Sequence, residues 1–335
     1  MSHSEQRRQA FAEVAGAAYD SLALLAMLEI GVFDALRSGP ATLAQLAERT
    51  KTSAARLRPM LDRVGAVGFL LKKHGHYQLV PGDEPLFDPN HVHALQLSDV
   101  HPTFTRMARA VDVLRTDRKI DVAGTGAEAT AEDRHRFLHY LHTRSIDGAN
   151  EVAELLTRTT VSRLLDVGCG LGTYTAAILR RAPEARAELM DRPTAAPSVD
   201  AFLRDEGLAD RATFRPGDFT RDPWGSGFDL VLISNVVHLV GEAGTRRLLD
   251  QTAAALAPGG RIAIKDTAID TDGYHPTSAG RFGVLMSMVT DGGGVFGAPE
   301  VGGWLEQSGF TVVEEHELVR ATGAYMLVAR LDRRA

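Results

Sequence analysis

Cysteine and clustered positive charge are both scarce in this chain of 335 residues. Cys169 is the single cysteine, so no disulfide can form within the chain, and a reducing compartment is expected. Lysine and arginine total 37 against 43 aspartates and glutamates, a formal net charge of -6. Binding to nucleic acid or to an anionic membrane surface depends on clustered positive charge. We therefore expect a small-molecule partner and neither nucleic acid nor membrane.

Long apolar runs are also missing from the sequence. Residues 1–14 are polar and lack the apolar centre of a secretory signal, and no apolar run approaches the ~20 residues of a spanning helix. We therefore expect a cytoplasmic protein. Its hydrophobic content of 44% is sufficient for ordinary cores, and its length allows about two domains of ~100–200 residues each.

The first 85 residues have the pattern of a winged helix. Apolar residues over 21–36 recur at helical spacing, with a bend expected at Gly31. Thr42 is placed to cap the next helix, a further helix follows, and two short strands are expected over 69–80. Helix, helix and hairpin predict a winged helix-turn-helix domain over 1–85. The first helix is more apolar than so small a domain can bury alone.

Beyond residue 160 the sequence alternates between short apolar runs and helical stretches. The apolar runs are 164–167, 187–190, 212–214, 230–233 and 262–264. This alternation predicts an α/β domain with a doubly wound parallel sheet over 161–335. Two later runs, 311–317 and 325–330, are close enough to form an antiparallel hairpin at its edge. The residues between the two domains, 86–160, are predicted to be a mainly helical connector with a loop near 123–131.

The strongest signal is the segment 164–173, Leu-Leu-Asp-Val-Gly-Cys-Gly-Leu-Gly-Thr. An apolar strand runs into Gly168, Gly170 and Gly172 and then into a helix. Glycine lets the backbone turn sharply and approach a ligand, and a helix N-terminus offers unpaired N–H donors. Dinucleotide enzymes use the spacing G-x-G-x-x-G because a pyrophosphate lies on the helix end. The closer spacing here, with Asp166 two residues ahead, favours a ligand with positive charge near that carboxylate.

Two further acids follow the next two predicted strands. Asp191 comes 19 residues after Gly172, where a carboxylate can accept hydrogen bonds from both hydroxyls of a ribose. Asp218 and Phe219 follow the third strand and supply another acceptor and an aromatic ring. Ligands of open α/β sheets bind at the carboxyl ends of the strands. All these residues are therefore predicted to meet at one site.

These residues resemble those of class I S-adenosylmethionine-dependent methyltransferases, in which the glycine motif (166–172), the ribose acid (Asp191) and the adenine-side pair (Asp218 and Phe219) have this order and spacing. The whole chain looks like the small-molecule O-methyltransferases, which include plant caffeate and flavonoid enzymes and bacterial polyketide-tailoring enzymes. The resemblance implies S-adenosylmethionine as the cofactor and a Rossmann-like sheet of seven strands. It also implies that the N-terminal domain forms a homodimer and contributes to the partner's substrate pocket.

The resemblance extends to the residues that would carry the chemistry. The segment 235–242 is similar to the family segment with the catalytic histidine, so His238 is predicted to be the general base that removes the acceptor's proton. Ser234, at the end of the fourth strand, is predicted to face the cofactor. Asp266 falls where the family has its first supporting acid, which would orient the imidazole and stabilise its cation.

Two positions depart from the plant enzymes. Leu239 follows His238 where the family usually has aspartate, and Ala298 occupies the place that matches the second glutamate, with Glu300 expected to face solvent. The base is therefore predicted to have less support than in the plant enzymes.

A run of histidines in the connector has a spacing that metal sites also use. His135, His139 and His142 fall at i, i+4 and i+7, on one face of a helix. No cysteine accompanies them in the sequence, and the resembling family usually needs no metal for transfer. We therefore predict that they bind no metal.

Three other functions remain open from the sequence. A transcription regulator would use the helix over 53–64 to read DNA, although Pro59 interrupts that helix and the chain is acidic. A C-methyltransferase acting on a small keto acid or an aromatic carbon is the second, although Leu239 removes the His-Asp pair with which some of these enzymes hold a metal. The third is a family member that binds the cofactor but no longer transfers a methyl group.

Overall fold

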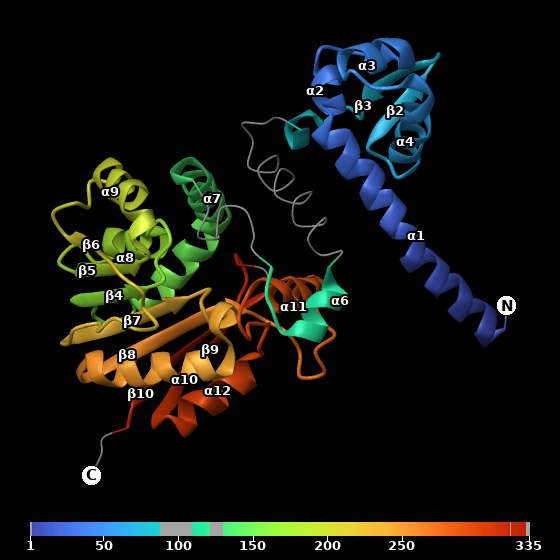
Figure 1. Cartoon of the computed structure of the whole chain (residues 1–335). Coiled ribbons are helices and arrows are strands. Elements are labelled where there is room, and N and C mark those ends of the chain that lie inside the picture. Colours follow the sequence, from blue (N-terminus) through green and yellow to red (C-terminus); the bar gives the residue numbers. More distant parts are fainter. Residues whose placement is uncertain (1, 88–108, 121–129, 322, 333–335) are drawn as a thin grey trace. The chain divides into compact units, whose positions relative to one another are not determined.

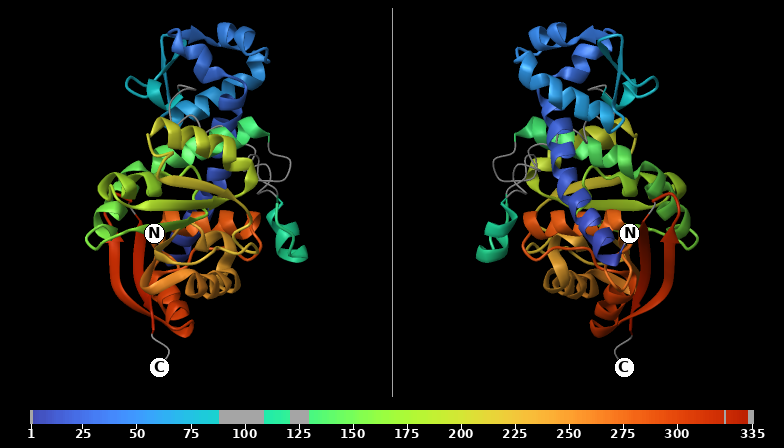
Figure 2. Two further views of the ribbon diagram at one scale, coloured as in Figure 1. Left: turned by 90° about the vertical axis from the view of Figure 1, so that its left-hand side faces the viewer. Right: turned by 90° about the vertical axis from the view of Figure 1, so that its right-hand side faces the viewer.

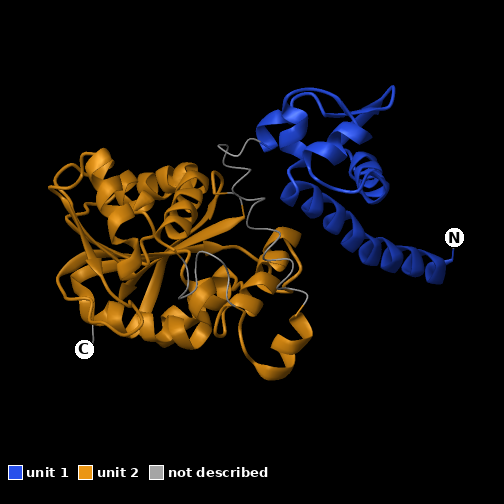
Figure 3. Ribbon diagram, turned by 45° about the horizontal axis from the view of Figure 1, so that its top comes forward, with its two compact units in different colours: residues 1–106 blue, residues 107–335 orange. Residues whose placement is uncertain are grey.

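The computed structural model describes residues 2–87, 109–120, 130–321 and 323–332 (Figure 1). The chain divides into two compact units, residues 1–106 and 107–335 (Figure 3). One cluster of buried apolar side chains belongs to the first unit, and two such clusters belong to the second. Each unit therefore has the core that an independent domain needs.

The first unit begins with a long helix that ends at a glycine. α1 (His3–Glu29) stops before Gly31, whose φ of 77° does not continue a helix. Gly31 is the predicted bend. The helix starts well before residue 21, where the sequence pattern placed it, because the alanine-, glutamate- and arginine-rich residues before it have high helix propensity. Phe11 is 77% exposed and Tyr19 is 75% exposed, so α1 presents apolar surface outside its own unit's core.

By length and composition alone, α1 also qualifies as a candidate membrane span, contrary to the expectation that no segment would. A single such helix near an N-terminus is weak evidence for a membrane protein. Exposed apolar side chains on one helix equally suit a surface that packs against another protein chain.

The rest of the first unit has the predicted order of helices and hairpin. Its elements are α2 (Val32–Arg37), β1 (Ala41–Thr42), α3 (Leu43–Arg49), α4 (Ala54–Ala66), β2 (Leu70–Lys73), β3 (His76–Leu79) and the 3-10 turn η1 (Glu84–Phe87). Thr42 caps α3, as predicted, by accepting a hydrogen bond from the backbone N–H of Gln45. Within the described residues of this unit, the strands pair in the order β1-β3-β2. The turn between β2 and β3 is the wing of the winged helix.

The second unit holds the remaining elements that the structure describes. They are α6 (Ala110–Thr116), α7 (Ala131–Leu156), β4 (Arg163–Val167), α8 (Thr173–Arg181), β5 (Arg186–Asp191), η2 (Pro193–Ala195), α9 (Ala196–Asp205), β6 (Ala212–Pro216), β7 (Phe228–Ser234), α10 (Val237–Ala255), β8 (Leu256–Thr267), α11 (Thr277–Val289), α12 (Ala298–Gln307), β9 (Phe310–Leu318) and β10 (Ala324–Leu331). α6 and α7 come from the predicted connector and belong to this unit. The loop predicted near 123–131 lies outside the described residues, apart from its last two.

One sheet runs through the described part of the second unit, in the order β6-β5-β4-β7-β8-β10-β9. The first five strands in this order are parallel, and β10 is antiparallel to both β8 and β9. The predicted parallel strands and the predicted hairpin are thus confirmed. The chain leaves β4 in one direction toward β5 and β6 and later returns on its other side with β7 and β8. Such a reversal is where ligands bind in doubly wound sheets.

Helices cover both faces of this sheet (Figure 1, Figure 2). Leu230 and Leu232 of β7 pack in the cluster formed with α7, α8 and α9. Val231 and Ile233 point the other way and pack in the cluster formed with α10 and α12. Side chains alternate between the two faces along a strand. The clusters therefore show which face of the sheet each residue at the carboxyl end of a strand occupies.

Candidate active site

The turn after β4 can be built only from glycine at its critical positions. Gly168, Gly170 and Gly172 have φ values of 71°, 57° and 91°, in the left-handed region. A Cβ atom on Gly168 would lie 2.6 Å from Cγ2 of Val236, and one on Gly172 would lie 2.7 Å from Cδ2 of Leu189. The backbone of the turn is therefore packed closely on one side and leaves no room for side chains.

Asp166 lies beneath this turn. Asp166 is only 2% exposed, and its Oδ2 accepts a hydrogen bond of 2.6 Å from the hydroxyl of Thr175 in α8. Burial, against the opposing hydrogen bond from Thr175 and together with the neighbouring charge of Asp191, raises the pKa of Asp166 to about 7. Asp166 thus ties the glycine turn to α8. Contact between this carboxylate and a cationic ligand stays a prediction.

Asp191, the last residue of β5, meets the glycine turn directly. Its Oδ2 accepts a hydrogen bond of 2.8 Å from the N–H of Gly170, and its Oδ1 accepts one of 2.7 Å from the N–H of Arg192. Burial raises the pKa of Asp191, and these two hydrogen bonds partly offset that rise. The carboxylate is fixed at the strand end, where the sequence placed the ribose acid.

Arg134 of α7 is a site residue that the sequence pattern does not reveal. Burial lowers the pKa of its guanidinium, as does the charge of Arg192, while Asp191 raises it. Its Nε is buried and has no hydrogen-bond partner among the described residues. A buried donor without a partner is costly, so this nitrogen is suited to a ligand bound beside Asp191. A lone arginine in a helix carries no motif that could have identified it.

The third predicted acid and its neighbour lie on the other side of the turn. Phe219 places Cε1 3.5 Å from where a Cβ of Gly168 would be, so the ring lies against the turn. The Oδ1 of Asp218 accepts hydrogen bonds from the backbone N–H and the hydroxyl of Thr220. The Thr220 hydroxyl bond, above all, holds the pKa of Asp218 below its usual value, although burial acts in the opposite direction. Asp218 is therefore an ionised, exposed acceptor that follows β6.

His238 and Asp266 form a buried pair at the ends of β7 and β8. His238 is 8% exposed and Asp266 is 2% exposed. The Nδ1 of His238 lies 2.7 Å from Oδ1 of Asp266, and the backbone N–H of His238 donates to Oδ2 at 3.2 Å. Burial raises the pKa of Asp266, but the charge and hydrogen bond of His238 outweigh it and leave that pKa below its ordinary value. The predicted pair is therefore brought together.

This geometry selects the tautomer of the neutral imidazole. Because a carboxylate only accepts hydrogen bonds, the neutral ring carries its proton on Nδ1 and keeps a lone pair on Nε2. The ring of Phe282 in α11 packs edge-on against the imidazole with centroids 4.9 Å apart. A histidine held in one tautomer between a carboxylate and an aromatic ring is suited to take a proton at Nε2.

Three further polar residues lie at the ends of β7 and β8. The Oγ of Ser234 is buried and has no hydrogen-bond partner among the described residues. The Nζ of Lys265 donates to Oδ1 of Asn235 at 2.7 Å. Lys265, like Arg134, has no sequence motif and was not predicted.

The segment matched to the family's second acid lies at the start of α12. Ala298 is the first residue of this helix and packs against the apolar cluster beneath it. Glu300 is exposed, as expected.

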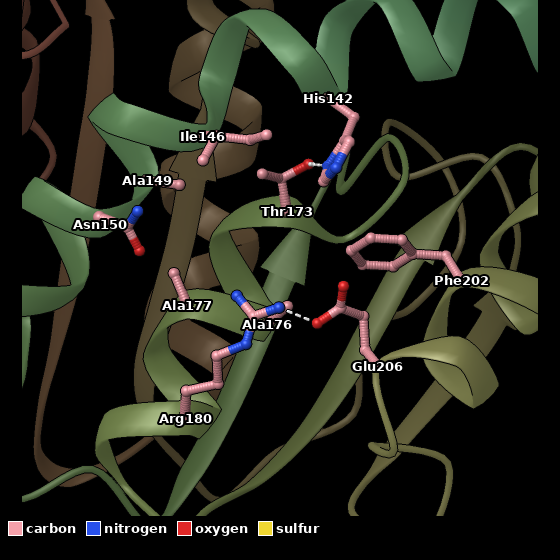
Figure 4. A pocket seen from close by; sticks show the side chains of 10 residues that line it. All are labelled: His142, Ile146, Ala149, Asn150, Thr173, Ala176, Ala177, Arg180, Phe202 and Glu206. Carbon is pink, nitrogen blue, oxygen red and sulfur yellow. Dashed lines mark hydrogen bonds and ion pairs between the residues drawn. The ribbon is translucent and has the colours of Figure 1, made fainter.

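The three histidines of α7 line a surface next to the glycine turn. His142 Nδ1 lies 2.9 Å from the hydroxyl of Thr173, the first residue of α8, and His135 Nδ1 lies 3.1 Å from the hydroxyl of Ser198. His142 also borders a cavity of about 130 Å³ between α7, α8 and α9 (Figure 4). No group of three or more histidine, cysteine or acidic side chains is arranged to hold a metal in the part of the chain that the structure describes.

Comparison with known protein families gives two matches. Residues 107–311 match the O-methyltransferase domain, and residues 12–82 match the O-methyltransferase dimerisation domain. Both matches agree with the predicted resemblance, and together they span most of both units.

Known proteins of similar sequence and structure include several O-methyltransferases. The mitomycin biosynthesis 6-O-methyltransferase of Streptomyces lavendulae is 30% identical, over 88% of this chain and 86% of that protein. The 3-hydroxy-5-methyl-1-naphthoate 3-O-methyltransferase of Streptomyces sahachiroi is 27% identical, over 87% and 86%. The solved structure of the mitomycin 7-O-methyltransferase superposes with a TM-score of 0.80 at 24% identity, over 98% of each chain, which shows a shared fold.

Proposed function

Because the chain belongs to the family of S-adenosylmethionine-dependent O-methyltransferases that act on secondary metabolites, we propose that His238 is the general base of its transfer reaction. The hydrogen bond of 2.7 Å between His238 and Asp266 carries this proposal. It holds Nε2 free to remove the proton of the acceptor hydroxyl, while Asp266 stabilises the imidazolium that results.

The cofactor would be held by residues at the ends of β4, β5, β6 and β7. Asp191 would accept hydrogen bonds from the ribose hydroxyls, and Asp218 with Phe219 would hold the adenine. The unpaired Nε of Arg134 suits the carboxylate of the methionine portion, and Ser234 would face the same portion from β7. When bound, the cofactor supplies a methyl group on a positively charged sulfur.

The residues of the chain then have three tasks. The glycine turn approaches the ligand with backbone alone and so fixes one reactant in place. α11 excludes water from the imidazole by packing Phe282 against it. His238 takes the proton as the acceptor oxygen gains the methyl group, so that the oxygen does not become positively charged.

Replacing His238 by alanine tests this proposal. We expect turnover to fall by the ~10²–10⁴-fold typical of a lost general base, while the affinity for S-adenosylhomocysteine, measured by calorimetry, changes little. An acceptor acidic enough to ionise by itself should restore activity to the variant at high pH. Activity equal to that of the native protein at neutral pH would show that His238 has a structural role.

We also propose that the chain is a homodimer through α1. The exposed Phe11 and Tyr19 and the match of residues 12–82 to a dimerisation domain support this proposal. Sedimentation should find a dimer at micromolar concentration. Replacing both aromatic residues by serine should shift the equilibrium toward the monomer, and a native protein that sediments as a monomer would contradict the proposal.

A further inference from the structure

Lys265 is a buried cation that the chemistry above does not use. Its residue is 7% exposed and lies in β8 one position before Asp266. Its Nζ donates to the neutral side chain of Asn235 at 2.7 Å. An ammonium group carries three donors, and its burial is costly unless a negative charge or several hydrogen bonds compensate for it. One amide oxygen does not supply that compensation.

The side chain of Lys265 lies on the face of the sheet opposite that of Asp266. Leu232 and Ala263, two residues earlier on β7 and β8, pack in the cluster beneath α7 and α8. Ser234 pairs in register with Lys265, so both side chains continue that face at the carboxyl end. The side chains of Ser234 and Lys265 therefore lie on the same face of the sheet, on neighbouring strands.

The strand order places this ammonium relative to the two reactants. β4, with the glycine turn, is followed by β7 and then by β8. Ser234 is thus next to the turn, and Lys265 lies one strand farther from it. An acceptor must approach the methyl group in line from the side away from the sulfur. Lys265 thus lies farther from the glycine turn than Ser234 does, at the end of the strand whose next residue, Asp266, pairs with His238.

We infer that Lys265 binds an anionic oxygen of the acceptor, a carboxylate on the aromatic ring system that carries the hydroxyl to be methylated. This inference rests on the proposed function, because it names the substrate class of the same site. The other charges near Lys265 are consistent with it. The charge of Asp266 acts on Lys265, but its Oδ1 makes hydrogen bonds to His238 and to the backbone N–H of Thr267. The ammonium therefore has charge left to offer to a ligand.

Paired aromatic acids and methyl esters test this inference. The probes are benzoate, 2-hydroxybenzoate and 3-hydroxy-1-naphthoate, each with its methyl ester, and the protein is full-length and saturated with S-adenosylhomocysteine at pH 7.5. Dissociation constants are measured by calorimetry. At least one acid should bind ~10–100-fold more tightly than its ester, as a charge-assisted hydrogen bond would give.

Variants at Lys265 test whether this residue causes the preference for the acid over its ester. Lys265→Met should remove the difference between acid and ester and leave ester binding nearly unchanged, while Lys265→Arg should keep part of the difference. Lys73→Met, which changes an exposed lysine in the first unit, is the matched control and should bind like the native protein. Melting temperature and affinity for S-adenosylhomocysteine establish that each variant is folded; Lys265→Gln replaces Lys265→Met if the latter does not fold.

The outcomes separate this inference from the proposed function. If no acid binds more tightly than its ester, or if Lys265→Met weakens both equally, the inference is wrong even when neutral phenols are methylated. If the preference depends on Lys265 but His238→Ala is as active as the native protein at neutral pH, the inference stands and the proposed role of the base fails.

Discussion

Asp166 and Asp266 occupy corresponding places in the sheet, but their pKa values are shifted in opposite directions. Each lies near the carboxyl end of a parallel strand, in β4 and β8, and each is 2% exposed. Asp266 meets an imidazole, which can share its charge, and its pKa is lowered. Asp166 meets a neutral hydroxyl and the negative charge of Asp191, and its pKa is raised to about 7. Burial alone does not decide whether a carboxyl group is charged, since the charges and hydrogen bonds of its partners also shift its pKa.

The strongest test of this comparison is the charge on Asp266. In Asp266→Asn the imidazole keeps an orienting partner but loses the charge that stabilises its cation. We expect turnover to fall, though less than the ~10²–10⁴-fold expected for His238→Ala, with little change in affinity for S-adenosylhomocysteine. Single-turnover kinetics at neutral pH measure the loss. An unchanged rate would mean that the charge of Asp266 has no part in transfer.

The next test concerns the stability of the protein without cofactor. Because burial raises the pKa of Asp166 in the folded state, folding retains a proton that the unfolded chain would release. Stability is therefore lost as pH rises from about 4, the ordinary value, to about 7. Asp166→Asn stays neutral and should be more stable than the native protein at pH 8, by at most about 4 kcal/mol at ~1.4 kcal/mol per unit.

Urea unfolding at pH 4, 6 and 8 measures this difference. The gain of Asp166→Asn should shrink toward zero as the pH approaches 4. A gain that does not depend on pH would show that the amide stabilises the fold through better hydrogen bonding, with no part played by the ionisation of Asp166.

The smallest expected effect is at Thr175. Its hydroxyl is the hydrogen bond that opposes the rise in the pKa of Asp166. Thr175→Val removes this bond and should cost about 1 kcal/mol of stability at pH 8, with a smaller loss at pH 4, where the carboxyl is protonated. The same urea series measures it. A larger loss at pH 4 would reverse the proposed relation between the two residues.

Sequence alone predicted the parts of the molecule that depend on local pattern. The glycine turn, the parallel strands and the cap at Thr42 each follow from a few neighbouring residues, and the structure confirms them. His238 and Asp266 were found through the resemblance, and the structure brings them together. Whether either is catalytic stays a prediction.

What the sequence did not reveal depends on contacts between distant segments. Arg134 approaches Asp191 only because α7 packs over the strand ends. In the sequence, Lys265 is only one polar residue in an apolar strand. Its pairing with Ser234 in the structure shows which face of the sheet it occupies. The sequence prediction placed the start of α1 too late, because the first turns of this helix form through helix propensity and have no apolar stripe that would reveal them.

The kink at Gly241 separates the turn that carries His238 from the rest of α10. Gly241 has φ 64° and ψ −169°, and a Cβ atom there would lie 2.1 Å from the carbonyl oxygen of Gly292. The helical hydrogen bonds of α10 thus do not continue into this turn. Instead, the backbone N–H of His238 donates to Asp266, and the N–H of Gly294 donates to the carbonyl of His238. In hydrogen exchange, the amides of His238 and Gly294 should therefore open together and independently of the helix that follows.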